Sequence, residues 1–232
     1  MTAQLPEFDG VTLDVGGVFV VPRHDRLLAA LATVGITCDA DRLWDGHYLA
    51  MHAVDAEESE AETFDTYVPA FCHHLGLRDD DLAKAVEVIE PMFGPSGLWS
   101  QPIAESVDAL RALHAAGIPM AVVSNADGTV ASVLAEAGVC QVGDGPHVPV
   151  LAIVDSGALG VAKPDPATFA PALEAFASLG IPADRVLHVG DSVHYDVLGA
   201  EAAGMAAVHF DPRRLCGASD HAHIQSLVDL LA

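Results

Sequence analysis

The stretch Val11-Thr12-Leu13-Asp14-Val15-Gly16-Gly17-Val18-Phe19-Val20 decides how the rest of the chain is interpreted. It is an apolar run interrupted by one carboxylate, Asp14, and by the adjacent glycines 16 and 17. A carboxylate in a buried strand is costly unless it is paired, bound to a metal or placed at the strand end. Adjacent glycines let the backbone turn sharply. The stretch indicates a buried strand that delivers Asp14 to a cleft, although a turn or capping role explains the stretch alone equally well.

The composition narrows the classes of partner. The chain has 232 residues, 51% of them hydrophobic, so it can bury a sizeable core. Its 33 acidic and 10 basic residues give a formal net charge of -23, which argues against nucleic acid and anionic membranes as partners. An anionic substrate would need local positive charge from a metal, a lysine or a helix N-terminus. Lysine occurs only at positions 84 and 163.

Cysteine spacing and the first residues of the chain bear on its environment. The cysteines are widely spaced without a C-x-x-C pair, which predicts free thiols rather than a zinc site or a redox motif: Cys38, Cys72, Cys140 and Cys216. Residues 1–9 show no basic segment followed by an apolar one, and no apolar run approaches the roughly 18 residues of a membrane span. We expect a soluble, cytoplasmic protein.

The pattern of apolar residues divides the chain. Residues 23–98 show only helical spacing and end in a Gly-Pro-Ser-Gly linker at 94–97. Strands and helices alternate afterwards, with strands predicted at 119–123, 148–154, 185–189 and 205–210, and helices at 106–116, 129–137, 166–179, 193–203 and 224–231. Such alternation favours a parallel sheet covered on both faces. We predict an α/β, doubly wound (Rossmann-like) core of residues 1–22 and 99–232 with an inserted α-helical cap of residues 23–98.

Polar residues gather where the predicted strands end, which is the edge at which such sheets bind ligands. They are Asp14, Ser124 with Asn125, Asp191 with Asp196, and Lys163 before a helix. Each of these residues, taken alone, fits an ordinary structural role. Ser124, Asn125 and Asp191 could be helix caps, and Lys163 and Asp196 could be surface residues. Together, the strand-end carboxylates suit Mg²⁺, and a lysine near a Ser-Asn turn suits a phosphate. A carboxylate beside a metal and a lysine is a good nucleophile toward phosphorus.

This constellation resembles the haloacid dehalogenase superfamily of hydrolases along the whole chain. The first motif is Asp14-Val15-Gly16-Gly17-Val18, the second Ser124-Asn125, and the third Lys163-Pro164. The fourth runs from Gly190-Asp191-Ser192 through Asp196 to the diagnostic segment 199–204. The helical insert resembles the small helical (C1-type) cap of the family's phosphatase-like branch.

The resemblance implies a role for each motif residue. Asp14 would be the nucleophile that forms an aspartyl-phosphate. Mg²⁺ would be held by Asp14, the carbonyl of Gly16 and Asp191. Ser124, Asn125 and Lys163 would bind the substrate phosphate, and Lys163 would also orient Asp14. Asp196 would support the site from behind the metal ligands or act as a weaker metal partner.

One position departs from the family pattern. Phosphatases of the family usually carry a second aspartate two residues after the nucleophile, and here that residue is Gly16. General acid–base catalysis typically raises a reaction rate about 10²–10⁴-fold. One interpretation is therefore a phosphatase weakened by the missing acid, with His24 or His194 as candidate proton relays. Two alternatives remain: haloacid dehalogenation, which needs no acid because halide leaves unprotonated, and a non-catalytic or regulatory metabolite-binding protein.

The sequence therefore predicts a Mg²⁺-dependent phosphatase that acts on a small cytosolic phosphorylated metabolite. It does not predict the substrate or the oligomeric state.

Overall fold

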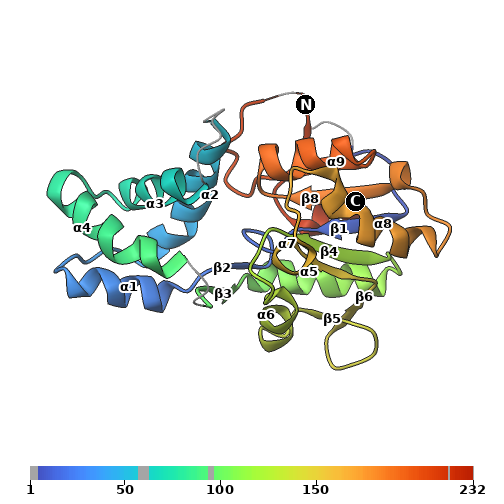
Figure 1. Cartoon of the computed structure of the whole chain (residues 1–232), viewed down its shortest axis with the longest axis horizontal. Coiled ribbons are helices and arrows are strands. Elements are labelled where there is room, and N and C mark those ends of the chain that lie inside the picture. Colours follow the sequence, from blue (N-terminus) through green and yellow to red (C-terminus); the bar gives the residue numbers. More distant parts are fainter. Residues whose placement is uncertain (1–4, 57–62, 94–96, 219, 232) are drawn as a thin grey trace. The chain divides into compact units, whose positions relative to one another are not determined.

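The structure is a computed structural model that describes residues 5–56, 63–93, 97–218 and 220–231. Most of the predicted linker at 94–97 lies outside the described residues. The chain divides into two compact units, Met1–Val20 with Pro102–Ala232, and Val21–Gln101 (Figure 1). Our predicted junctions were 22/23 and 98/99.

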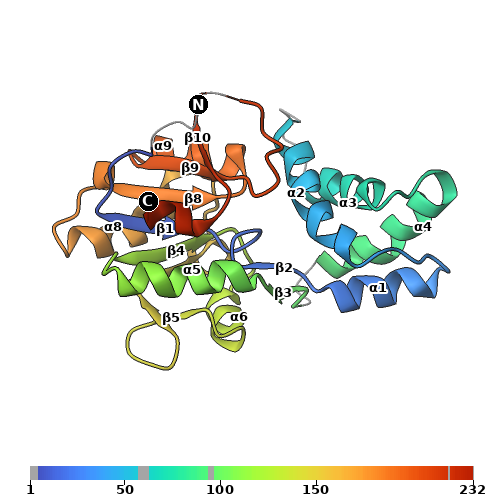
Figure 2. The same ribbon diagram turned by 180° about the vertical axis from the view of Figure 1, so that it is seen from behind.

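The first unit contains a six-stranded parallel sheet in the order β10-β9-β8-β1-β4-β7. Its strands are β1 (Gly10–Leu13), β4 (Met120–Ser124), β7 (Ile153–Asp155), β8 (Val186–Gly190), β9 (Ala206–Phe210) and β10 (Ala222–Ile224). Helix α5 (Ala104–Ala115) lies on one face of the sheet, and α8 (Ala170–Ala177) with α9 (Leu198–Ala202) lies on the other (Figures 1 and 2). The predicted α/β doubly wound fold is confirmed.

One core cluster explains why α8 and α9 share a face. Phe169 and Phe176 pack against Val123 of β4 and Val186 of β8, all of them fully buried. Gly10 of β1 has no side chain because a Cβ there would lie 2.4 Å from the Phe176 ring. The apolar runs of the sequence form strands because both faces of the sheet are covered.

The remaining elements of this unit are short. They are β5 (Cys140–Val142), β6 (Val148–Val150), α6 (Val130–Glu136), α7 (Ser156–Leu159), the 3₁₀ turns η2 (Pro166–Phe169), η3 (Ala183–Arg185) and η5 (Leu227–Leu231), and the π-helical turn η4 (Val193–Val197).

Two predicted elements were wrong. The strand predicted at 148–154 is two strands in different sheets, because β6 pairs with β5 whereas β7 pairs with β4. The helix predicted at 224–231 begins instead as β10, because the outer edge of β9 is open and accepts a strand there. Ile224 is buried in this strand, and only Leu227–Leu231 forms a helical turn.

The second unit is mainly helical. It contains α1 (His24–Thr33), α2 (Asp41–Ala56), α3 (Thr63–His74), α4 (Asp79–Ile89) and η1 (Glu90–Phe93). The short strands β2 (Val20–Pro22) and β3 (Trp99–Pro102) pair with each other. Among the described residues, no helix combines the length and the apolar character that a membrane crossing requires.

Strand register brings the motifs together. Leu13 pairs with Val189 of β8 on one side and with Val122 of β4 on the other. Residues just beyond these pairs therefore emerge at one edge of the sheet: Asp14 after β1, Ser124 at the end of β4 and Asp191 after β8.

Candidate active site

Asp14 stands at the end of the central strand. Its backbone N–H donates to the Val189 carbonyl at 2.9 Å, so the strand ladder still fixes the residue that carries the carboxylate. The residue is buried, and its Oδ1 lies 2.9 Å from the Lys163 ammonium nitrogen. The carboxylate is therefore paired rather than free, which removes much of the cost of its burial.

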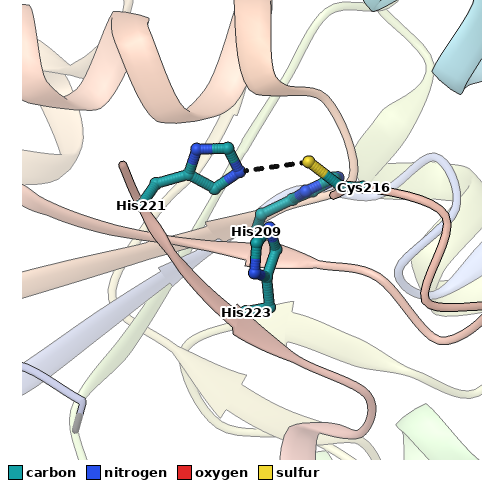
Figure 3. Close-up of side chains that lie close together, drawn as sticks. All are labelled: His209, Cys216, His221 and His223. Carbon is teal, nitrogen blue, oxygen red and sulfur yellow. Dashed lines mark hydrogen bonds between the residues drawn. The ribbon is translucent and has the colours of Figure 1, made fainter. Parts of the chain in front are cut away.

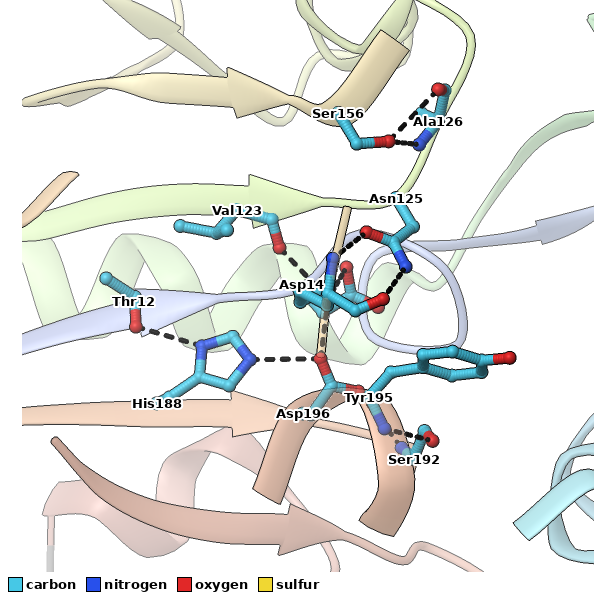
Figure 4. A network of polar contacts seen from close by, with 11 residues as sticks. Thr12, Asp14, Val123, Asn125, Ala126, Ser156, His188, Ser192, Tyr195 and Asp196 are labelled. Carbon is cyan, nitrogen blue, oxygen red and sulfur yellow. Dashed lines mark hydrogen bonds and ion pairs between the residues drawn. The ribbon is translucent and has the colours of Figure 1, made fainter. Parts of the chain in front are cut away.

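Lys163 is the buried cation of the site. Besides Asp14, its Nζ lies 2.5 Å from Asp196 Oδ1 and donates to the Val123 carbonyl at 3.2 Å. Figure 4 shows this network at the ends of the strands. Three oxygens therefore lie around the ammonium, and the fold fixes its position between Asp14 and Asp196.

The electrostatics of the three charged groups follow from burial and pairing. Burial raises the pKa of Asp14, with the Lys163 ammonium opposing the shift. Burial also acts against the charge of Asp196, but Lys163 and the hydrogen bond from His188 hold the pKa of Asp196 well below its usual range. The two carboxylates outweigh burial at Lys163 and raise its pKa, so the lysine stays charged.

Behind Asp196 lies a chain of buried polar groups that the sequence analysis missed. His188 Nε2 lies 3.0 Å from Asp196 Oδ1, and His188 Nδ1 lies 2.9 Å from Thr12 Oγ1. In the neutral ring, Nε2 donates to the carboxylate and Nδ1 accepts from the hydroxyl. Asp196 Oδ2 accepts from the Ser192 N–H at 3.0 Å. His188 occupies an inward position of a buried strand, where sequence alone does not separate a polar support from a core residue.

The π-helical turn η4 places Asp196. Ser192 caps this turn by accepting the Tyr195 N–H at 3.0 Å (Figure 4). Gly190 has no side chain because a Cβ there would lie 2.0 Å from Asp196 Cγ. The glycine of the fourth motif thus makes room for the carboxylate that holds Lys163.

Asn125 lies differently from the phosphate-contacting position that we predicted. Its Nδ2 donates to the Lys163 carbonyl at 2.9 Å, and its Oδ1 accepts the Lys163 N–H at 2.8 Å. Both ends of the amide therefore clamp the main chain of Lys163. Ser124, the last residue of β4, is buried at the same edge.

Asp155 and Ser156 hold the loop that follows Ser124, and the sequence analysis missed both. The Asp155 carboxylate accepts the N–H of Gly128 at 2.9 Å and of Val130 at 3.0 Å. Ser156 Oγ accepts the Ala126 N–H at 3.0 Å (Figure 4). Their only signal in the sequence is their place at the end of a strand.

Three carboxylates form an oxygen-rich group beside the lysine. One oxygen each from Asp14, Asp191 and Asp196 lies within 4.8 Å of the others. Carboxylate oxygens are the ligands that Mg²⁺ prefers, so the donor set fits that ion. Since both Asp196 oxygens already accept hydrogen bonds, Asp14 and Asp191 are the carboxylates suited to contact it.

The candidate proton relays lie on elements of different compact units. His194 is exposed on η4. His24 belongs to the other unit, where its ring packs edge-on against Trp44 with centroids 4.5 Å apart. Burial lowers the pKa of His24. Gly16 forms a bridge with Val20 and supplies only its main chain.

The chain is similar to known proteins in sequence and in fold. A family model described as haloacid dehalogenase-like hydrolase matches residues 8–204. A Danio rerio protein, haloacid dehalogenase-like hydrolase domain-containing protein 3, is 36% identical over 112 residues, which are 48% of this chain and 41% of that protein. The aligned part therefore spans less than half of this curated relative.

Solved structures with the same fold cover nearly the whole chain. YfnB from Bacillus subtilis, named a HAD-hydrolase and bound to magnesium, has a TM-score of 0.60 at 17% identity, covering 97% of both chains. A HAD phosphatase from Thermococcus onnurineus has a TM-score of 0.56 at 20% identity, covering 96% of both. A 2-haloacid dehalogenase from Pseudomonas syringae pv. Tomato DC3000 has a TM-score of 0.54 at 23% identity, covering 97% of this chain and 96% of its own.

Proposed function

The chain belongs to the haloacid dehalogenase-like hydrolase family, and within that family we propose that it is a Mg²⁺-dependent phosphatase of a small phosphorylated metabolite. The observation that carries the proposal is the ion pair of Lys163 with Asp14, 2.9 Å long, beside the Asp191 carboxylate. A phosphate ester requires a nucleophile and positive charge at one point. In a chain with a net charge of -23, Lys163 supplies such charge at the sheet edge.

The metal would be held by the side chains of Asp14 and Asp191 and by the Gly16 carbonyl. When bound, Mg²⁺ adds positive charge that offsets the phosphate oxygens and favours the ionised form of Asp14. YfnB, which has the same fold, was solved bound to magnesium, and this supports the proposal of a magnesium site.

The residues of the chain then perform two displacements. An Asp14 oxygen attacks phosphorus, the bond from phosphorus to the ester oxygen breaks, and the electron pair leaves with the alkoxide. Lys163 and Ser124 contact the phosphate oxygens during this step. Water next attacks the phosphorus of the aspartyl-phosphate, which releases phosphate and restores the Asp14 carboxylate.

The lack of an acidic side chain at Gly16 limits the rate of this reaction. Because it carries no acid, the leaving alkoxide takes its proton from water, which is slow for alkyl esters. Esters of acidic alcohols, which leave without protonation, suffer least. The proposal therefore includes a steep dependence of the rate on the leaving group.

Haloacid dehalogenation is the second candidate, and Gly16 is the observation that favours it. Attack of Asp14 on carbon expels halide, which needs no proton. Dehalogenation does not need Mg²⁺, however, and Asp191 beside Asp14 forms a donor set suited to that ion.

Phosphate release from para-nitrophenyl phosphate, with and without Mg²⁺, tests the proposal. We expect Mg²⁺-dependent turnover that Asp14→Asn abolishes and that Asp144→Asn, in an exposed loop, leaves unchanged. Absence of turnover on this activated ester would overturn the phosphatase. Chloride release from a 2-haloacid without added metal would establish the second candidate. Thermal stabilisation by a phosphorylated metabolite without turnover would indicate a binding protein.

A further inference from the structure

Four nitrogen and sulfur side chains gather at the edge of the sheet formed by β9 and β10. They are His209, Cys216, His221 and His223, shown together in Figure 3. One ligand atom from each lies within 4.8 Å of all the others. The catalytic network uses none of these side chains. Three imidazoles and one thiol are the ligand types of a tetrahedral zinc site, not of a magnesium site.

Strand pairing assembles the histidines. His209 of β9 and His223 of β10 are paired positions in neighbouring parallel strands, so their side chains project from the same face. His221 lies in a bend just before β10, and its ring is near the rings of both His209 and His223. The three rings pack edge-on or tilted, with centroids 4.5 to 5.5 Å apart.

Cys216 reaches the cluster from the connection between the two strands. The Asp211 carboxylate accepts the N–H groups of Leu215 and Cys216, each at 2.9 Å, and so fixes the backbone that carries the thiol. Cys216 Sγ lies 3.6 Å from His221 Nε2 (Figure 3). In a tetrahedral zinc site with ordinary bond lengths, a sulfur and a nitrogen ligand are about 3.5 Å apart.

Outer hydrogen bonds orient two of the rings. His209 Nε2 lies 3.2 Å from the Asp191 carbonyl oxygen, and His221 Nδ1 lies 2.7 Å from Asp220 Oδ1. In the tautomers that donate these bonds, the lone pairs are on His209 Nδ1 and His221 Nε2. Metal-binding histidines usually donate their other nitrogen to a carbonyl or a carboxylate in this way.

His223 provides an independent sign of a ligand. Its Nε2 is buried and has no hydrogen-bond partner among the residues that the structure describes. A buried polar atom without a partner lowers the stability of the fold, and a metal bond would remove that cost.

We propose that His209, Cys216, His221 and His223 bind one Zn²⁺ ion in a closed, four-coordinate site that fastens β10 and its preceding loop to β9. On binding, the Cys216 thiol releases its proton and the sulfur bonds to the metal as thiolate. All four positions are filled by protein, so the site is structural. It stabilises β10, a three-residue strand at the edge of the sheet.

Metal titration of the untagged, metal-depleted protein tests the site. We expect one tightly bound Zn²⁺ per chain in competition with a chromophoric chelator, a rise in melting temperature, and a thiolate-to-metal charge-transfer band when Co²⁺ replaces Zn²⁺. Cys216→Ser and His223→Asn should each weaken zinc binding by at least about 10-fold. Cys38→Ser and the exposed His114→Asn are the matched controls and should bind as the unaltered protein does.

Thiol alkylation tests the same site without any substitution. Stoichiometric Zn²⁺ should slow alkylation of Cys216 strongly and leave the rate at Cys38 unchanged. The proposal fails if Cys216 is alkylated equally fast with and without zinc, if Co²⁺ gives no thiolate band, or if the two ligand variants bind zinc as well as the controls do.

Discussion

Lys163 Nζ lies 2.5 Å from Asp196 Oδ1, and both side chains are only 2% exposed. The pair shows that Lys163, one of only two lysines in the chain, is a buried structural centre of the active site rather than a surface contact for substrate alone. Asp196 and Asp14 share the charge of Lys163, so the position of Asp14, the proposed nucleophile, depends on the residues that hold Lys163 in place.

Lys163→Met leaves two buried carboxylates without their cation. We expect a loss of about 3–5 kcal/mol in the free energy of unfolding, together with loss of phosphatase activity. Denaturant unfolding and phosphate release measure the two effects. Lys84→Met is the matched control, because the Lys84 side chain is 51% exposed and its ion pair with Asp81 contributes little. Equal stability of the two variants would contradict the buried network.

Gly190→Ala places a methyl group where Asp196 stands, since the new Cβ would lie 2.0 Å from Asp196 Cγ. The carboxylate must move away from Lys163 and His188. We expect kcat to fall by at least about 10²-fold and the melting temperature to drop clearly, because the added methyl group overpacks a rigid interior. At Gly217 a Cβ would meet nothing within 4 Å, so Gly217→Ala should change neither quantity.

Asn125→Ala removes both hydrogen bonds to the Lys163 main chain. Since the amide positions Lys163, we expect kcat to fall more than KM rises, with a loss of stability of about 1–3 kcal/mol. Steady-state kinetics separate the two parameters. Gln141→Ala is the control, because its bond to the Gly143 carbonyl is long, at 3.5 Å. A change confined to KM would instead place Asn125 in direct contact with phosphate.

Gly16→Asp restores the carboxyl group that the family's phosphatases usually carry. Gly17 has a positive φ of 66° and Gly16 does not, so an aspartate at position 16 avoids the left-handed backbone that it would meet at position 17. We expect turnover of alkyl phosphates to rise by about 10²-fold, with little change for para-nitrophenyl phosphate. The ratio of the two rates measures the effect of the leaving group.

Gly17→Asp is the contrasting variant, and it should lose stability because its backbone is left-handed. If Gly16→Asp leaves the rate ratio unchanged while the protein stays folded, the missing acid does not limit the reaction.

Cysteine reactivity depends on pH in a way that burial determines. Burial raises the pKa of Cys72 and of Cys140 to about 12. At pH 9 such a thiol is only about 0.1% ionised, whereas an ordinary thiol is about three-quarters ionised. We expect alkylation at these positions to be very slow in the native protein, to increase with rising pH, and to become fast in denaturant. Peptide mapping after pulse alkylation measures each site, with partly exposed Cys38 as the internal reference.

The fold and the gathering of the motif residues at one edge of the sheet could be predicted because their signals are local. A strand that ends in Asp14, another that ends before Asp191 and the Lys163-Pro164 pair before a helix are visible as short patterns. Parallel strands then bring their carboxyl ends to one edge without further information. The haloacid dehalogenase-like family membership also rests on these short motifs.

What each side chain does at that edge depends on contacts between distant parts of the chain. Asn125 was expected to bind phosphate, and only the structure shows that its two amide atoms are bonded to Lys163, 38 residues away. His188 and Thr12 support Asp196 from neighbouring strands, and neither has a sequence pattern of its own.

The C-terminal segment shows most clearly that local sequence patterns do not predict contacts between distant residues. The sequence by itself predicted that the stretch from Val11 to Val20 contains a buried strand ending at Asp14, because a carboxylate within an apolar run is costly unless it is paired, bound to a metal or placed at a strand end. It predicted free cysteines and a last helix, and it could not place His209, Cys216, His221 and His223 together. That cluster exists because β10 pairs with β9, and strand pairing is decided by tertiary contacts rather than by local spacing.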